Sequence, residues 1–148
     1  MLSVGIDIGT STSQVIFSHL TIENTAGYFS VPSVEIVGKE IIYKSPVYRT
    51  PLLDRSLIDG AALKKILEKE YQNAGVVPAQ VETGAAIITG ESARKENASM
   101  VLDELSVFAG DFVVSTAGPD LESVIAGQGS GAWKYSEDNG VVVVNLDI

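Results

Sequence analysis

The strongest local signal in this 148-residue chain is the stretch Gly5-Ile6-Asp7-Ile8-Gly9-Thr10-Ser11-Thr12-Ser13. From Leu2 to Ile8, apolar side chains alternate with small or polar ones, which is the period of a β-strand. Gly9-Thr10-Ser11 breaks the pattern, and a second strand-like run follows from Ser13 to Ile22. Because so few residues separate the two runs, we expect them to pair as antiparallel neighbours.

The turn between these runs has the composition of an anion-binding loop. Gly9 permits a tight turn and the close approach of a ligand. Backbone amides and the hydroxyls of Thr10, Ser11 and Thr12 can donate hydrogen bonds to phosphate oxygens. Asp7 would repel phosphate unless a cation lay between them, which indicates Mg²⁺. The alternative is a tight hairpin whose Asp and Thr side chains satisfy only the turn itself.

A second carboxylate, Asp147, stands at the end of the apolar run Val141–Leu146. Its context, Asn-Leu-Asp-Ile, is similar to the Gly-Ile-Asp-Ile that contains Asp7. The continuous run is typical of a strand that is buried on both faces. Two acidic strand ends that met across a cleft would hold one divalent ion; the alternative is a solvated acid near the terminus.

The remaining segments alternate between strands and helices. Their patterns predict a hairpin of Val34–Val37 and Glu40–Tyr43 around Gly38-Lys39, a helix from Asp59 to Gly75, a strand Gly84–Thr89, a helix Ser92–Ala109, a strand Asp111–Ser115 and a helix from Pro119 that Gly127, Gly129 and Gly131 unwind. An antiparallel meander followed by such alternation predicts an α/β fold with a mixed sheet flanked by helices.

Composition excludes several classes of function. The net charge of −9 argues against nucleic acid as a partner, because phosphate contacts need clustered Lys and Arg. The absence of Cys excludes disulfides, thiolate metal ligands and Cys nucleophiles. No apolar run approaches the ~20 residues of a membrane helix, so we expect no membrane partner. The single His, His19, gives no basis for a Ser-His-Asp arrangement.

The stretch GIDIGTSTSQ, residues 5–14, resembles the first phosphate-binding hairpin of the actin, Hsp70 and sugar-kinase superfamily, and VVVVNLDI, residues 141–148, resembles the strand before its second phosphate loop. Longer stretches are similar to the ethanolamine ammonia-lyase reactivating factor family: SVGIDIGTSTSQVIFSHLTIENTAG, YRTPLLDRSLIDG, ITGESARKENA and STAGPDLESVIAGQGSGA. The resemblance implies a ribonuclease-H-like mixed five-stranded sheet, one half of the ATPase fold, over residues 1–138. Residues 139–148 would be the truncated first strand of the second half.

The same resemblance implies an ATP- and Mg²⁺-dependent chaperone that releases damaged adenosylcobalamin from ethanolamine ammonia-lyase during ethanolamine utilization. The expected location is the cytoplasm, with association with a bacterial microcompartment as a further expectation. Asp7 and Asp147 would be the catalytic, metal-side carboxylates, and the cofactor-binding residues would be Gly9, Thr10, Ser11, Thr12 and Ser13. The alternatives are a sugar or carboxylate kinase of the same superfamily and a nucleotide-binding scaffold that does not hydrolyse.

The start of the third predicted helix departs from the superfamily. In Hsp70-like proteins a catalytic Glu precedes a Pro there, whereas here Gly118 precedes Pro119. That base is therefore absent or replaced, and we expect slow hydrolysis by the full-length protein. Asp120 and Glu122 are expected only to complement the helix dipole. We expect this chain alone, without the second phosphate loop, to have no useful ATPase activity.

Overall fold

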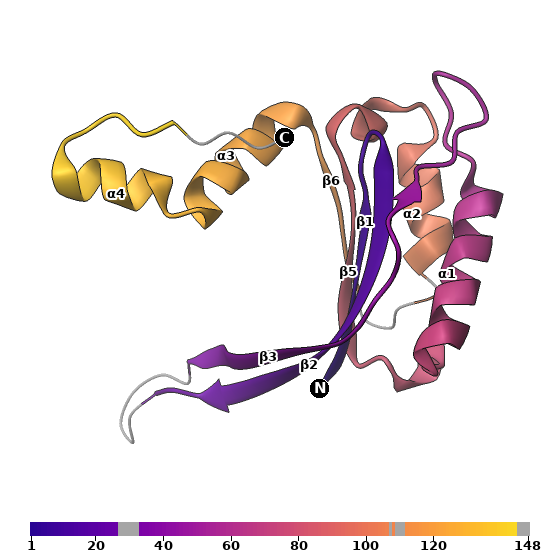
Figure 1. The fold of residues 1–148 in the computed structure, drawn as a ribbon, viewed down its shortest axis with the longest axis horizontal. Helices are drawn as coiled ribbons and strands as arrows, with labels where there is room; N and C mark the ends of the chain where they lie inside the picture. The colour runs from indigo at the N-terminus through magenta and orange to yellow at the C-terminus, as the bar shows by residue number, and fades with distance from the viewer. Residues whose placement is uncertain (27–32, 107, 109–111, 145–148) are drawn as a thin grey trace.

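The computed structural model describes residues 1–26, 33–106, 108 and 112–144. A mixed sheet with the strand order β3-β2-β1-β5-β6 forms its centre (Figure 1). The strands are β1 (Leu2–Ile8), β2 (Thr12–Asn24), β3 (Val34–Lys44), β5 (Thr83–Thr89) and β6 (Phe112–Ala117), and the short β4 (Tyr48–Arg49) also pairs with β2. β2 is antiparallel to β1 and β3, whereas β1, β5 and β6 are parallel. The predicted ribonuclease-H-like mixed sheet is therefore confirmed.

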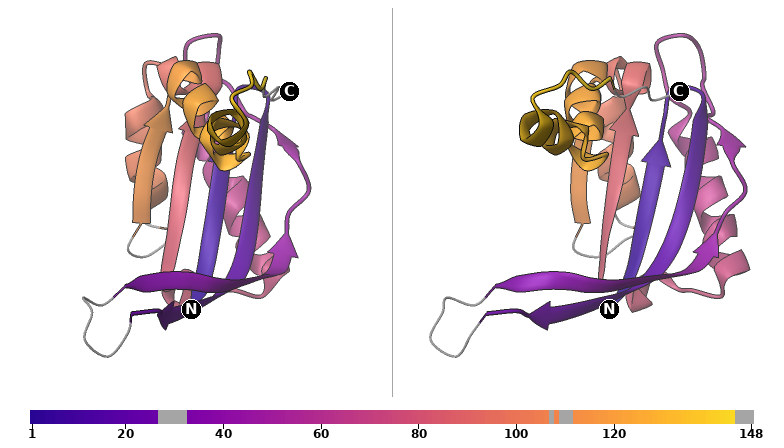
Figure 2. Two further views of the ribbon diagram at one scale, coloured as in Figure 1. Left: turned by 90° about the vertical axis from the view of Figure 1, so that its left-hand side faces the viewer. Right: turned by 60° about the vertical axis from the view of Figure 1, so that its left-hand side comes forward.

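The helices lie on both sides of this sheet. They are α1 (Gly60–Ala74), α2 (Ala98–Ser106), α3 (Pro119–Gly129) and α4 (Ala132–Asn139), with short 3₁₀ turns η1 (Pro78–Gln80) and η2 (Gly90–Arg94). α1 and α2 cover one face, and α3 and α4 lie on the opposite side, beyond the end of β6 (Figures 1 and 2). The second face is consequently open over much of its length.

The hydrophobic core lies between the sheet and α1 and α2, because alternate strand residues point to that face. Its buried side chains include Val4, Ile6, Ile8, Val15, Phe17, Leu63, Leu67, Tyr71, Ile88, Val101, Leu102 and Leu105. The rings of Phe17 and Tyr71 meet edge to face, with centroids 4.8 Å apart. The Asp59 side chain caps α1 by accepting from the amide of Ala62, and Gly75 ends the helix in a left-handed conformation, as predicted.

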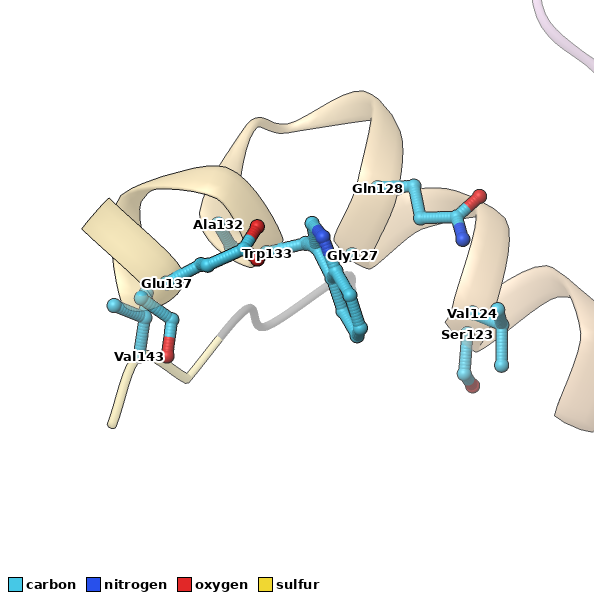
Figure 3. Close-up of a pocket in the computed structure, with 9 residues that line it drawn as sticks. Ser123, Val124, Gly127, Gln128, Ala132, Trp133, Glu137 and Val143 are labelled. Atoms are coloured by element: carbon cyan, nitrogen blue, oxygen red, sulfur yellow. The ribbon is translucent and has the colours of Figure 1, made fainter. Parts of the chain in front are cut away.

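The opposite face of the sheet carries a shallow hollow of about 550 Å³. Its lining combines apolar side chains of the strands with polar ones, including Asp7, Gln14 and Lys39. A separate hollow of about 670 Å³ lies between α3 and α4, where the largely exposed Trp133 is one of the lining residues (Figure 3). Asp7 thus lies on the face that α1 and α2 leave uncovered.

The predicted hairpin at Gly38-Lys39 is wrong, because Val34–Lys44 is one continuous strand. Gly38 lies opposite Thr21 of β2, and a Cβ on Gly38 would come within 3.3 Å of the Cβ of Thr21. The glycine therefore permits a close approach within the sheet rather than a turn. The partner of β3 is the extended β2, whose register against it shifts twice.

Three further boundaries differ from the prediction. The segment predicted as one helix over Ser92–Ala109 begins within the 3₁₀ turn η2, and the α-helix covers Ala98–Ser106. Just before this helix, the side chain of Asn97 accepts a hydrogen bond from the Ile58 amide and donates one to the Ile58 carbonyl. α3 continues through Gly127 to Gly129, and the unpredicted α4 follows. Val141–Val144 forms no strand and is exposed, while Asn145–Ile148 lies outside the described residues.

Candidate functional site

The candidate site lies at the carboxyl ends of the parallel strands β1 and β5. Asp7 is next to the last residue of β1, and Thr89 is the last residue of β5. The Thr89 hydroxyl donates a hydrogen bond of 3.4 Å to Oδ1 of Asp7. In α/β folds the carboxyl ends of parallel strands are where ligands bind, so the sheet presents Asp7 at the expected edge.

The turn between β1 and β2 exposes the groups that the sequence predicted for phosphate binding. The Gly9 amide donates to the carbonyl of Thr12 at 2.8 Å, and a Cβ on Gly9 would lie 3.0 Å from that same oxygen, so the turn leaves little room for a side chain. Thr10, Ser11 and Thr12 are exposed. Among the described residues, the amides of Thr10 and Ser11 have no acceptor. The turn can therefore offer backbone amides together with hydroxyls to an anion.

Hydroxyl groups hold this turn from behind. The carbonyl oxygen of Gly9 accepts from the Thr50 hydroxyl at 2.8 Å and from the Ser92 hydroxyl at 3.0 Å. The buried Ser13 hydroxyl lies 2.9 Å from that of Thr50. Among the predicted site residues, Ser13 thus faces inward, whereas Thr10, Ser11 and Thr12 face outward. Sequence reasoning missed Thr50 and Ser92, because no local spacing signals a contact from 41 or 83 residues away.

The end of β5 brings α3 to the same turn. Gly90 has φ of +59°, and a Cβ there would lie 2.4 Å from Oγ1 of Thr10. The Gly90 amide donates to Oε2 of Glu122 at 3.0 Å. Glu122 was expected only to complement the helix dipole, but it contacts the segment beside the turn. Asp120, in the same helical turn, is exposed and its side chain makes no hydrogen bond within the described part of the chain.

Two carboxylates, those of Asp7 and Glu122, dominate the electrostatics of the site. Asp7 is exposed as a residue, but partial burial of its carboxyl raises its pKa; the hydrogen bond from Thr89 acts in the opposite direction, and the negative charge of Glu122 raises the pKa further. Two carboxylates close to one exposed turn repel each other until a positive charge is present. No group of three or more His, Asp or Glu side chains gathers as a metal site within the described residues. Asp147 lies outside them, so its pairing with Asp7 stays a prediction.

A buried carboxylate supports the site from the far side of the sheet. Glu70 of α1 accepts hydrogen bonds of 2.6 Å from the phenol groups of Tyr43 and Tyr48, and one of 3.0 Å from Asn73. Burial acts to raise the pKa of Glu70, but these hydrogen bonds outweigh it and the pKa lies below its ordinary value. Since Tyr48 belongs to β4, Glu70 anchors the strand that leads directly to Thr50.

Solved structures with a similar chain course include two phosphatase-type enzymes. The PPX-GPPA enzyme of Aquifex aeolicus is 17% identical, with a TM-score of 0.49, over 78% of this chain and 36% of that one. An exopolyphosphatase from Cytophaga hutchinsonii is 14% identical, with a TM-score of 0.48, over 89% of this chain and 39% of the other. No functional argument follows from similarity at this level.

None of the helices in the described part of the chain is both long and apolar enough to cross a membrane.

Sequence relatives are much closer. The chain is 49% identical over all its 148 residues to the ethanolamine ammonia-lyase reactivase EutA of Escherichia coli strain K12 and, to the same extent, to that of Salmonella typhimurium strain LT2. It spans 32% of the length of each of these relatives. The family model described as ethanolamine utilisation protein EutA matches residues 1–148. Because this match covers the whole chain, the protein belongs to the EutA family of ethanolamine utilisation proteins.

Proposed function

We propose that this chain supplies the first phosphate-binding hairpin of an ATP-dependent chaperone that reactivates ethanolamine ammonia-lyase. The observation that carries the proposal is the turn Gly9–Thr12, whose hydroxyls are exposed and whose amides at Thr10 and Ser11 have no acceptor among the described residues. The names of the two curated relatives support the lyase as the partner. Release of damaged adenosylcobalamin would be the step that ATP drives.

Each residue of the site then has a distinct role. The amides and hydroxyls of Thr10 and Ser11, with the hydroxyl of Thr12, would bind the β- and γ-phosphates. Asp7, an exposed oxygen ligand, suits a hard cation, and Mg²⁺ held through water beside it would neutralise phosphate charge. Ser13 would support the turn from inside rather than touch the nucleotide.

The proposal extends to the parts of the ATPase beyond this hairpin. Residues 1–138 would form the first half of the ATPase domain, and residues 139–148 would begin the second half with Asp147 as its carboxylate. A cytoplasmic location, in association with a bacterial microcompartment, belongs to the same proposal.

The test uses the full-length protein, wild type and with Asp7→Asn, in calorimetric titrations with ATP in the presence and absence of Mg²⁺. We expect Asp7→Asn to weaken binding at least about tenfold with Mg²⁺ and to have much less effect without it, because the lost group acts through the cation. Asp120→Asn is the matched control, since Asp120 is an exposed acid of the nearby helix.

Reactivation of inactivated ethanolamine ammonia-lyase by the same variants completes the test. Loss of ATP-dependent reactivation in Asp7→Asn, with retention in Asp120→Asn, is the expected result. Undiminished ATP-dependent reactivation by Asp7→Asn would refute the role given to Asp7. Transfer of phosphate to a small sugar or carboxylate, without reactivation, would instead identify a kinase.

A further inference from the structure

We propose that Glu122 is a positioning residue for the phosphate-binding turn, which it holds through the backbone amide of Gly90. Its expected effect on ATP binding rests on the proposed function. The geometric part, a mechanical link from α3 to the turn, stands on contacts within the protein and can be tested without nucleotide.

The first step of the link joins α3 to the end of β5. Oε2 of Glu122 accepts a hydrogen bond of 3.0 Å from the Gly90 amide. Gly90 adopts the left-handed backbone conformation, which L side chains rarely adopt. On its other side Gly90 lies close to Thr10, because a Cβ on Gly90 would be only 2.4 Å from Oγ1 of Thr10. A shift of Gly90 therefore displaces or releases Thr10.

The second step runs from the residues after Gly90 to the turn itself. The Glu91 amide donates to Oγ1 of Thr10 at 2.9 Å, and the fully buried Ser92 donates from its hydroxyl to the carbonyl of Gly9 at 3.0 Å. These residues share the short 3₁₀ turn η2 with Gly90, so a shift of Gly90 would be passed on to them. The Thr10 hydroxyl accepts from the Glu91 amide, and its own proton remains available to donate to a ligand.

The helical backbone of α3 holds Glu122 at the other end of the link. Its amide bonds to the carbonyl of Gly118 at 3.0 Å, so the residue stands in the first full turn of the helix. A hydrogen bond to an ionised carboxylate is stronger than one to a neutral acceptor. The negative charge of Glu122 lies near that of Asp7, and the hydrogen bond from Gly90 offsets part of this repulsion.

The test is hydrogen–deuterium exchange of the full-length protein by mass spectrometry without nucleotide, followed by titration with Mg-ATP. We expect Glu122→Ala to accelerate exchange on the order of fivefold in peptides covering residues 86–94 and 5–14, and to weaken Mg-ATP binding by a similar factor. Glu122→Gln, which keeps an acceptor oxygen, is expected to remain within about twofold of the wild type in both measurements. Asp120→Ala is the matched control and should change neither.

The outcomes separate this inference from the proposed function. Unchanged hydrogen–deuterium exchange in residues 5–14 of Glu122→Ala overturns the link, whatever the affinity of that variant for Mg-ATP. A Glu122→Gln variant as impaired as Glu122→Ala also overturns it, since charge rather than the hydrogen bond would then be the cause. Faster exchange in a protein whose wild type binds no ATP supports the link and refutes the nucleotide function.

Discussion

The hydroxyl of Thr50 donates a hydrogen bond of 2.8 Å to the carbonyl oxygen of Gly9, which ties the segment after β4 to the turn between β1 and β2. The same hydroxyl lies 2.9 Å from that of Ser13, and both side chains are buried. Thr50→Val would leave the Ser13 hydroxyl and one position on the Gly9 carbonyl without this partner. We expect a loss of about 1–3 kcal/mol in the free energy of unfolding, measured by urea denaturation.

Thr50→Ser is the control, because serine keeps the hydroxyl while losing only a methyl group. It should remain within about 1 kcal/mol of the wild type. In the full-length protein, Thr50→Val should also bind Mg-ATP more weakly than Thr50→Ser. Equal ATP affinities for the two variants would show that Thr50 does not position the turn.

Gly90 and Gly75 form a natural pair for separating backbone strain from steric contact. Both have positive φ, but a Cβ at Gly75 meets nothing within 4 Å, whereas one at Gly90 meets Oγ1 of Thr10 at 2.4 Å. Gly75→Ala is expected to cost about 1 kcal/mol of stability through strain alone. Gly90→Ala should cost about 1–2 kcal/mol more, measured by denaturant midpoints, and it alone should weaken Mg-ATP binding. Equal costs at the two positions would contradict the close approach of Thr10.

Glu70 makes stability depend on pH in a defined direction. Its folded-state pKa lies below the ordinary value of 4.5, so its ionised form contributes stability above that pH, and the contribution is lost as pH falls through the folded-state pKa. Glu70→Gln should lower the free energy of unfolding by about 1–3 kcal/mol near neutral pH, because two phenol donors lose a charged acceptor. The difference from the wild type should shrink below about pH 4.5.

Glu68→Gln serves as the reference for this effect, since Glu68 lies on the exposed side of the same helix. Its difference from the wild type near neutral pH should be small. A Glu70→Gln difference that stayed constant from neutral pH down to about pH 3 would contradict the assigned role of the carboxylate.

The 148-residue chain by itself is expected to hydrolyse ATP no faster than buffer. Positioning of phosphate and metal supplies most of the catalysis in phosphoryl transfer, and the described residues provide one proposed phosphate-binding turn. Release of inorganic phosphate from Mg-ATP is the measurement, with the Asp7→Asn chain as the background. Hydrolysis by the wild-type chain that Asp7→Asn abolishes would refute this expectation.

Local signals in the sequence predicted those elements whose ends and faces they encode. Asp59 and Gly75 set the two ends of α1 through contacts within a few residues, and the alternation in β1 identifies its buried face. The predicted turn at Gly38 was wrong, because the glycine there permits the close approach of Thr21 in the neighbouring strand. The predicted helix over Ser92–Ala109 failed for a similar reason, since Ser92 and Asn97 bond to distant backbone groups.

The candidate site divides in the same way. The sequence alone proposes Gly9, Thr10, Ser11 and Thr12, because these polar and small residues are contiguous in the chain. Thr50, Ser92 and Glu122 could not be predicted from it, since only tertiary folding brings them to the turn. Glu122 also resembles an ordinary acid of a helix start, which is a far commoner role.

The dependence of the Gly9–Thr12 turn on partners far along the chain has a consequence for synthesis on the ribosome. The first hairpin emerges early, yet the carbonyl of Gly9 can accept its second hydroxyl hydrogen bond only when Ser92 has been synthesised, 83 residues later. Until then a nascent chain lacks the hydrogen bond from Ser92 that supports the turn between β1 and β2. If the turn binds nucleotide as proposed, competence to bind it would therefore arise only after more than half of these residues have been made.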